Sequence, residues 1–130
     1  MGACYSVALK AKLLDEPGAI KALQEHIAND TGVNYSLDDL AKEGTTTETF
    51  DGLMRIFLAG WKICPFTVEA DKDFVIYTND FDARYGWEMV MIDMFYTLTP
   101  FLDNKSEFII DIDDEYDRFI IRNGKCVQLH

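Results

Sequence analysis

The chain has 130 residues, of which 48% are hydrophobic, and its 23 acidic and 12 basic residues give a formal net charge of -11. A chain of this length and apolar content can bury a core, so we expect a single domain over residues 1–130 and not a disordered segment. The negative charge repels nucleic acid and anionic membrane surfaces, so we expect neither as a direct partner.

The cysteines and histidines are few and far apart. Cys4, Cys64 and Cys126 form no Cys-x-x-Cys pair, and the two histidines are His26 and His130. This spacing argues against a disulfide framework and against a structural zinc site. We therefore expect reduced cysteines, a cytoplasmic location, and no metal or other cofactor.

The first half of the chain begins with a strict alternation. Residues 5–13 place Tyr5 and every second residue after it on one side, which predicts a strand with one face on a core. An acidic start with an early proline at residues 15–17 predicts a helix that ends near residues 29–32. Shorter helices are predicted over residues 36–44 and 50–60.

The second half alternates between strands and one strong helix. Residues 66–69 and 74–77 predict a hairpin around a turn at 70–73, and residues 79–86 predict a loop. Residues 87–98 are the clearest helix, because apolar side chains recur there at helical spacing. This stripe is interpreted as core, and it consists of Trp87, Val90, Met91, Met94, Phe95 and Leu98.

The last part of the chain predicts three consecutive strands. Residues 107–113 and 117–122 are joined around Asp114, Glu115 and Tyr116, and Asn123-Gly124 is a strong hairpin turn before residues 125–129. The sequence therefore predicts an α+β fold: an antiparallel sheet of about six strands with helices packed on one face, ending in a three-stranded meander.

Five acidic residues lie close together in the stretch DIDDEYD, which raises the possibility of a calcium loop. An EF-hand needs glycine at position 6 and an acid at position 12. Counted from Asp111, these positions hold Tyr116 and Arg122, and counted from Asp113 they hold Arg118 and Gly124. Strands also flank the stretch where helices are required, so the EF-hand is excluded.

Catalysis by carboxylates is the main alternative. Asp80 with Asp82, and Asp111 with Asp113, form two Asp-x-Asp pairs, and in a strand such residues share a face about 6.6–6.8 Å apart. That spacing suits a two-acid mechanism or a divalent metal. However, no His or Lys adjoins either pair, and the chain has neither a Gly-x-Ser-x-Gly motif nor a glycine-rich phosphate loop.

The density of acids around the two predicted hairpins remains to be explained. If both hairpins belong to one sheet, their carboxylates can merge into one anionic surface, although solvated turns and charged strand edges would look similar. The candidate binding residues are Asp80, Asp82, Asp111, Asp113, Asp114, Glu115 and Asp117.

We therefore expect a non-enzymatic acidic binding protein that occupies the basic, nucleic-acid-binding surface of a partner protein. A phage or mobile-element inhibitor of a defence nuclease would fit this description, as would an immunity protein against a nuclease toxin. The alternative is a small enzyme or divalent-metal protein that uses the paired aspartates. A third possibility is an acidic domain that binds a small molecule or its own copy.

Overall fold

The computed structural model describes residues 2–29, 42, 46–59, 67–113 and 115–129. They form an α+β fold around one antiparallel six-stranded sheet, in the order β2-β3-β1-β4-β5-β6. The strands are β1 (Gly2–Ala11), β2 (Thr67–Asp71), β3 (Phe74–Arg84), β4 (Glu107–Ile112), β5 (Glu115–Arg122) and β6 (Lys125–Leu129). The last three strands are the predicted meander, and β1 lies in the interior of the sheet.

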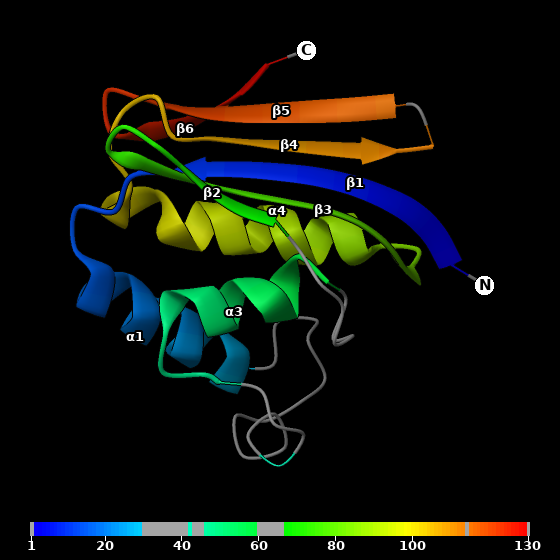
Figure 1. Cartoon of the computed structure of the whole chain (residues 1–130), viewed down its shortest axis with the longest axis horizontal. Coiled ribbons are helices and arrows are strands. Elements are labelled where there is room, and N and C mark those ends of the chain that lie inside the picture. Colours follow the sequence, from blue (N-terminus) through cyan, green and yellow to red (C-terminus); the bar gives the residue numbers. More distant parts are fainter. Residues whose placement is uncertain (1, 30–41, 43–45, 60–66, 114, 130) are drawn as a thin grey trace.

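Three α-helices lie within the described residues: α1 (Glu16–Ala28), α3 (Phe50–Phe57) and α4 (Trp87–Leu98), the last followed by the 3-10 turn η1 (Thr99–Phe101). Figure 1 shows all three on the same side of the sheet, with α4 next to the strands. Among the described elements, no helix covers the opposite face, which we call the open face. The helix expected over residues 36–44 falls outside the described residues, apart from Lys42.

Side-chain caps explain where the first two of these helices begin. The Oδ1 atom of Asp15 accepts a hydrogen bond from the Gly18 amide at 3.1 Å, and the Oγ1 atom of Thr49 accepts one from the Gly52 amide at 3.0 Å. Each cap satisfies an amide that the first turn leaves unpaired. Both helix starts agree with the predictions from the sequence.

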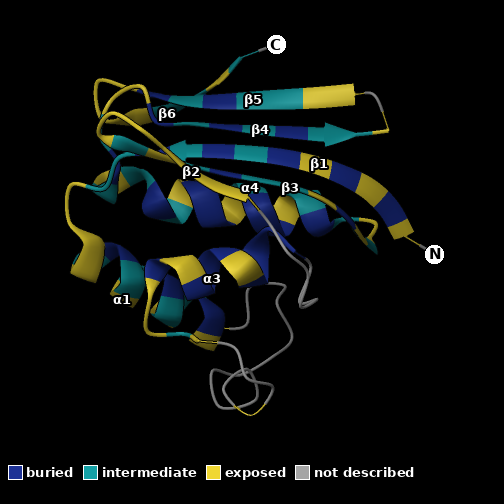
Figure 2. Cartoon of the chain, viewed as in Figure 1, coloured by how far each residue is buried: buried dark blue, intermediate teal, exposed yellow. Residues whose placement is uncertain are grey.

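The core lies between the sheet and the helices, where Figure 2 shows the buried residues. Tyr5, Val7 and Leu9 of β1 are at most 5% exposed, so the predicted alternation of this strand is confirmed. The predicted stripe on α4 is also buried, with exposed fractions from 0% to 5%. Phe95 of this stripe packs against Phe108 of β4, with 5.6 Å between the ring centroids.

Several predicted boundaries were wrong. Ala70 and Asp71 are the last residues of β2 and not part of the turn, and the helix predicted over residues 50–60 ends at Phe57. Residues 79–84 are the second half of β3 and not a loop, because they pair along their whole length with β1. Glu115 and Tyr116 belong to β5 and not to a turn, since they pair with β4. β1 runs from Gly2 to Ala11, and beyond it Leu13 makes only an isolated bridge to Leu102.

Candidate binding surface

Strand pairing brings three of the predicted acids together on the open face. Asp80 and Asp82 of β3 lie opposite Ser6 and Cys4 of β1, and Asp111 of β4 lies opposite Ser6 from the other side. Asp80 and Asp111 are therefore two strand spacings apart, about 9.4–9.8 Å. Asp80 and Asp82 follow one another along β3 at about 6.6–6.8 Å.

Two small polar side chains of β1 donate hydrogen bonds to these carboxylates. The Ser6 hydroxyl donates to Asp80 Oδ1 at 2.6 Å, and the Cys4 thiol donates to Asp82 Oδ1 at 3.0 Å. The hydrogen bond to Asp82 and the charge of that carboxylate raise the pKa of Cys4, and the charge of Asp113 adds to the effect. Asp113 therefore acts on the same end of the open face. We call Asp80, Asp82, Asp111 and Asp113 the acidic surface.

Two of the remaining predicted acids, Glu115 and Asp117, do not join this surface. Glu115 and Asp117 pair with Ile112 and Ile110, and Ile110 is buried in the core, so both acids lie on the helix side of the sheet. Asp117 accepts a hydrogen bond from the Gln128 side chain at 3.2 Å. Asp114 lies outside the described residues.

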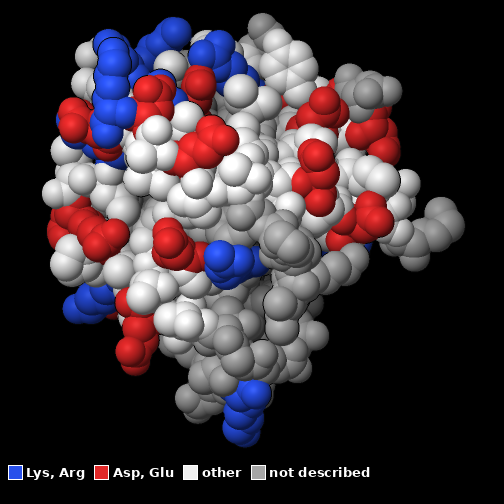
Figure 3. Space-filling model, viewed as in Figure 1, with Lys and Arg blue, Asp and Glu red and all other residues white. Residues whose placement is uncertain are grey.

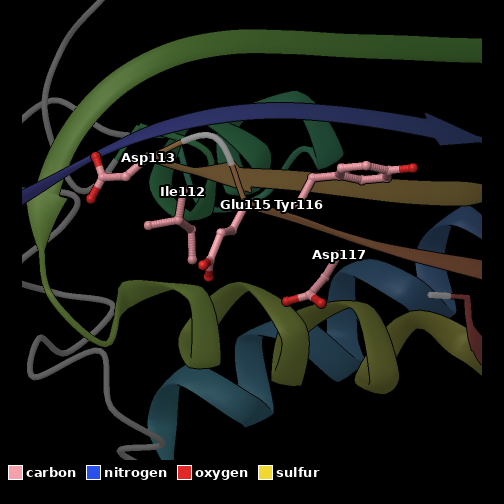
Figure 4. Close-up of a pocket in the computed structure, with 5 residues that line it drawn as sticks. All are labelled: Ile112, Asp113, Glu115, Tyr116 and Asp117. Carbon is pink, nitrogen blue, oxygen red and sulfur yellow. The ribbon is translucent and has the colours of Figure 1, made fainter.

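A cavity of about 430 Å³ adjoins the tip of the β4–β5 hairpin. Figure 4 shows its lining, with Glu115 and Asp117 pointing to the side where α4 lies and Tyr116 pointing away from them. Asp113, in the left part of the view, is separate from both of these acids. The acid-rich stretch is thus divided between two faces of the sheet instead of forming a single cluster.

Basic side chains gather at the other end of the sheet. Figure 3 shows Lys and Arg mixed with acids at the upper left, where Figure 1 places the β2–β3 and β5–β6 turns, whereas acids predominate at the right. Four ion pairs lie at the left end, with nitrogen–oxygen distances of 2.6 to 4.0 Å. They are Lys10–Asp71, Lys12–Asp73, Lys12–Asp103 and Arg118–Glu107.

Apolar side chains adjoin the acidic surface. Tyr116 lies opposite Asp111 on the open face and is 66% exposed. The next row of the same face contains Ala8 and Ile109, both half-buried, between Thr78 of β3 and Arg118 of β5, the latter paired with Glu107. The carboxylates therefore border an aromatic ring and a small apolar strip, so the surface can offer apolar contact as well as charge.

Reasoning from the sequence missed the partners of these acids. The alternation of β1 already placed Ser6 on the side away from the core, but its neighbours were unknown because residues 79–84 were interpreted as a loop. The signal that was available is that Tyr77, Phe81 and Ala83 stand at odd positions and Thr78, Asp80 and Asp82 at even ones, which has the period of a strand although the polar Asn79 interrupts it.

Two further findings concern the described residues. They contain no group of three or more His, Cys, Asp or Glu side chains placed to hold a metal ion. No helix among them has the length and apolarity needed to cross a membrane.

Comparison with known proteins gives no relative for this chain. No family model matches the sequence, and no curated protein or solved structure is detectably similar to it.

Proposed function

We propose that this protein uses its acidic surface to occupy the basic, nucleic-acid-binding surface of a partner protein, and that it does so without catalysing a reaction. The observation that carries the proposal is the strand register that brings Asp80, Asp82 and Asp111 together on the open face. Like charges gathered on one face repel one another and so oppose folding. A cationic partner accounts for this arrangement better than a contribution to stability does.

The hydrogen bonds from β1 support the same proposal. Ser6 and Cys4 donate hydrogen bonds to Asp80 and Asp82, and these bonds restrict the orientation of the two carboxylates. A side chain that is already ordered loses less conformational entropy when a partner binds. Carboxylates held in this way are suited to charge-assisted hydrogen bonds with Arg or Lys.

The exposed ring beside the carboxylates adds a contact that arginine favours. Tyr116 is 66% exposed and lies across from Asp111. Tyrosine is enriched at protein interfaces, and a guanidinium group can stack on its ring while it pairs with a neighbouring carboxylate. We therefore expect an arginine-rich partner surface.

The test compares two variants of equal charge. The first carries Asp80→Asn, Asp82→Asn and Asp111→Asn, and the second carries Glu25→Gln, Glu48→Gln and Asp93→Asn at exposed positions outside the acidic surface. Each variant and the wild type would be immobilised and exposed to a lysate of the source organism at about 50 and 200 mM salt, because screening weakens charge attraction over this range.

We expect the wild type and the second variant to capture the same basic protein, more weakly at the higher salt concentration, and the first variant to lose it. Duplex DNA should displace the captured protein, because the proposal places the acidic surface in a nucleic-acid-binding site. Equal capture by the first variant would refute the role of the three aspartates. A captured protein that duplex DNA cannot displace would refute the role as an occupant of a nucleic-acid site.

A further inference from the structure

A second cavity, of about 510 Å³, lies under the β2–β3 hairpin where α1 and α3 begin. We call it the hairpin groove. Its walls include Val68 and Val75, which are 42% and 36% exposed, and the buried ring of Phe50. Val68 is paired with Tyr77, whose side chain is buried, so the groove lies on the helix side of the sheet and not on the open face. Its volume falls in the range of small-molecule sites.

One polar group lies at the buried end of this groove. Tyr77 is 3% exposed, its ring packs against Phe50 with 5.9 Å between the centroids, and its hydroxyl donates to Asp51 Oδ1 at 2.5 Å. Burial raises the pKa of Tyr77, and the hydrogen bond to Asp51, the charge of Asp51 and the charge of Glu16 raise it further. The hydroxyl therefore stays protonated and holds one oxygen of Asp51 in place.

The charge of the groove has a single sign. Four acids line it: Glu16 and Asp51, from the first turns of α1 and α3, and Glu69 and Asp73 of the β2–β3 hairpin. No Lys or Arg is among the lining residues, although Lys12 pairs with Asp73 at 3.7 Å from outside the groove. A first-turn acid commonly stabilises its own helix N-terminus. That role accounts for Glu16 and Asp51 separately, but it does not explain why both acids line one groove with apolar walls, with Asp51 held by the buried hydroxyl of Tyr77.

We propose that the hairpin groove binds a small organic cation: a primary ammonium group on an apolar body about the size of a phenyl ring. The ammonium group lies between Asp51 and Glu16 and donates charge-assisted hydrogen bonds to their carboxylates. The apolar body packs on Val68, Val75 and Phe50, which removes apolar surface of both molecules from water. A carboxylate ligand of the same shape is repelled, and a neutral one lacks the charged hydrogen bonds.

The probe is 2-phenylethylamine, which is protonated at pH 7, and the matched neutral probe is 2-phenylethanol. Binding would be followed by NMR titration of the isotope-labelled protein at low salt. We expect the amine to bind at least about tenfold more tightly than the alcohol, because hydrogen bonds between charged groups are stronger than those between neutral groups. Both probes should shift the signals of Val68, Val75 and Tyr77.

Two variants and one control locate the site. Glu16→Gln with Asp51→Asn should remove the preference for the amine, whereas Glu25→Gln with Asp93→Asn, a control of equal charge outside the groove, should keep it. Ala70→Trp, at an exposed position of β2 that lines the groove, should fill it and abolish binding of both probes without changing either carboxylate. Circular dichroism would verify that each variant is folded.

Three results would each overturn the proposal. The first is an absence of saturable amine binding to the wild type, the second is equal affinity for amine and alcohol, and the third is unchanged amine binding to Ala70→Trp. If Glu16→Gln with Asp51→Asn does not fold, the comparison of the two probes and the Ala70→Trp variant still decide the outcome. The acidic surface lies on the other face of the sheet, so this result and that of the partner capture are independent.

Discussion

At the scale of single residues, two tyrosines connect the sheet to acids in the first turns of helices. Tyr5 of β1 has its hydroxyl 2.8 Å from Glu88 Oε2 and 2.9 Å from the carbonyl oxygen of Arg84, and its ring stacks on Phe81. Burial first, and then the hydrogen bond and the charge of Glu88, together raise the pKa of Tyr5 from 10.0 to about 12. Tyr77 and Asp51 form the same kind of pair at the hairpin groove.

The raised pKa of Tyr5 predicts a loss of stability at alkaline pH. In the unfolded chain the phenol loses its proton near its ordinary pKa of about 10, whereas in the folded protein it keeps the proton up to about pH 12. The stabilising contribution is therefore complete below pH 10 and is lost as the pH rises from about 10 to about 12. Tyr5→Phe should remove this part of the pH dependence.

Urea denaturation of the wild type and of Tyr5→Phe across this range provides the measurement. The difference in their free energies of unfolding should be constant below pH 10 and should shrink above it. The comparison contains its own control, because Tyr77 and every other titrating group are present in both proteins. A difference that stays constant up to pH 12 would contradict the attribution of this loss of stability to Tyr5.

At the scale of elements, α4 could be predicted from the sequence because its signal is local. A buried stripe at helical spacing needs no knowledge of the rest of the fold, and Met91 and Met94 are 0% exposed as expected. The same helix carries Met89, which is 55% exposed. Met89 and Met94, five positions apart, therefore lie on the solvent side and the core side of the same helix.

This contrast gives a matched pair of substitutions. Met94→Asp should unfold the protein or lower its free energy of unfolding by at least about 4 kcal/mol, because it buries an unpaired charge in the core. Met89→Asp should change it by no more than about 0.5 kcal/mol, as surface substitutions usually do. Chemical denaturation followed by circular dichroism would measure both. A stable, folded Met94→Asp protein would show that α4 does not face the core.

The second half of β3 could not be predicted in the same way because its signal depends on a distant partner. Asn79, Asp80 and Asp82 have the composition of a loop, and they form a strand because β1 pairs with them from Gly2 onward. The candidate site could not be predicted in full for the same reason. The acidic character of the site was predictable from the sequence. The face on which each acid lies was not, because a shift of one position in register moves a strand's side chains to the other face. The register is what separates Asp111 from Glu115 and Asp117.

At the scale of the whole molecule, the net charge of -11 is unevenly distributed. Ion pairs hold Lys10, Lys12 and Arg118 at one end of the sheet, and the acidic surface lies toward the other end. Repulsion among the acids opposes folding, and dissolved salt screens it. Stability should therefore depend on ionic strength, and the acidic surface should account for a large part of that dependence.

The melting temperature tests this expectation. Between about 50 and 500 mM NaCl the wild-type value should rise, because screening relieves the repulsion. At 50 mM, Asp80→Asn with Asp82→Asn and Asp111→Asn should melt about 2–4 °C above the wild type and should respond less to salt. The variant with Glu25→Gln, Glu48→Gln and Asp93→Asn has the same net charge and should gain less. Equal gains for both variants would mean that total charge matters and its placement does not.

The interior position of β1 also has a consequence for synthesis on the ribosome. Cys4 donates a hydrogen bond to Asp82, 78 positions later in the chain, and the Lys12 amide donates one to Ser106, 94 positions later. Neither of the strands that flank β1 has therefore been synthesised when β1 emerges. At about 5–20 residues per second, the wait for these partners lasts roughly 4–20 s. During that time the apolar side of β1 is exposed in the nascent chain. A chaperone that acts near the ribosomal exit should therefore increase the yield of folded protein, and a slower elongation rate should increase the need for it.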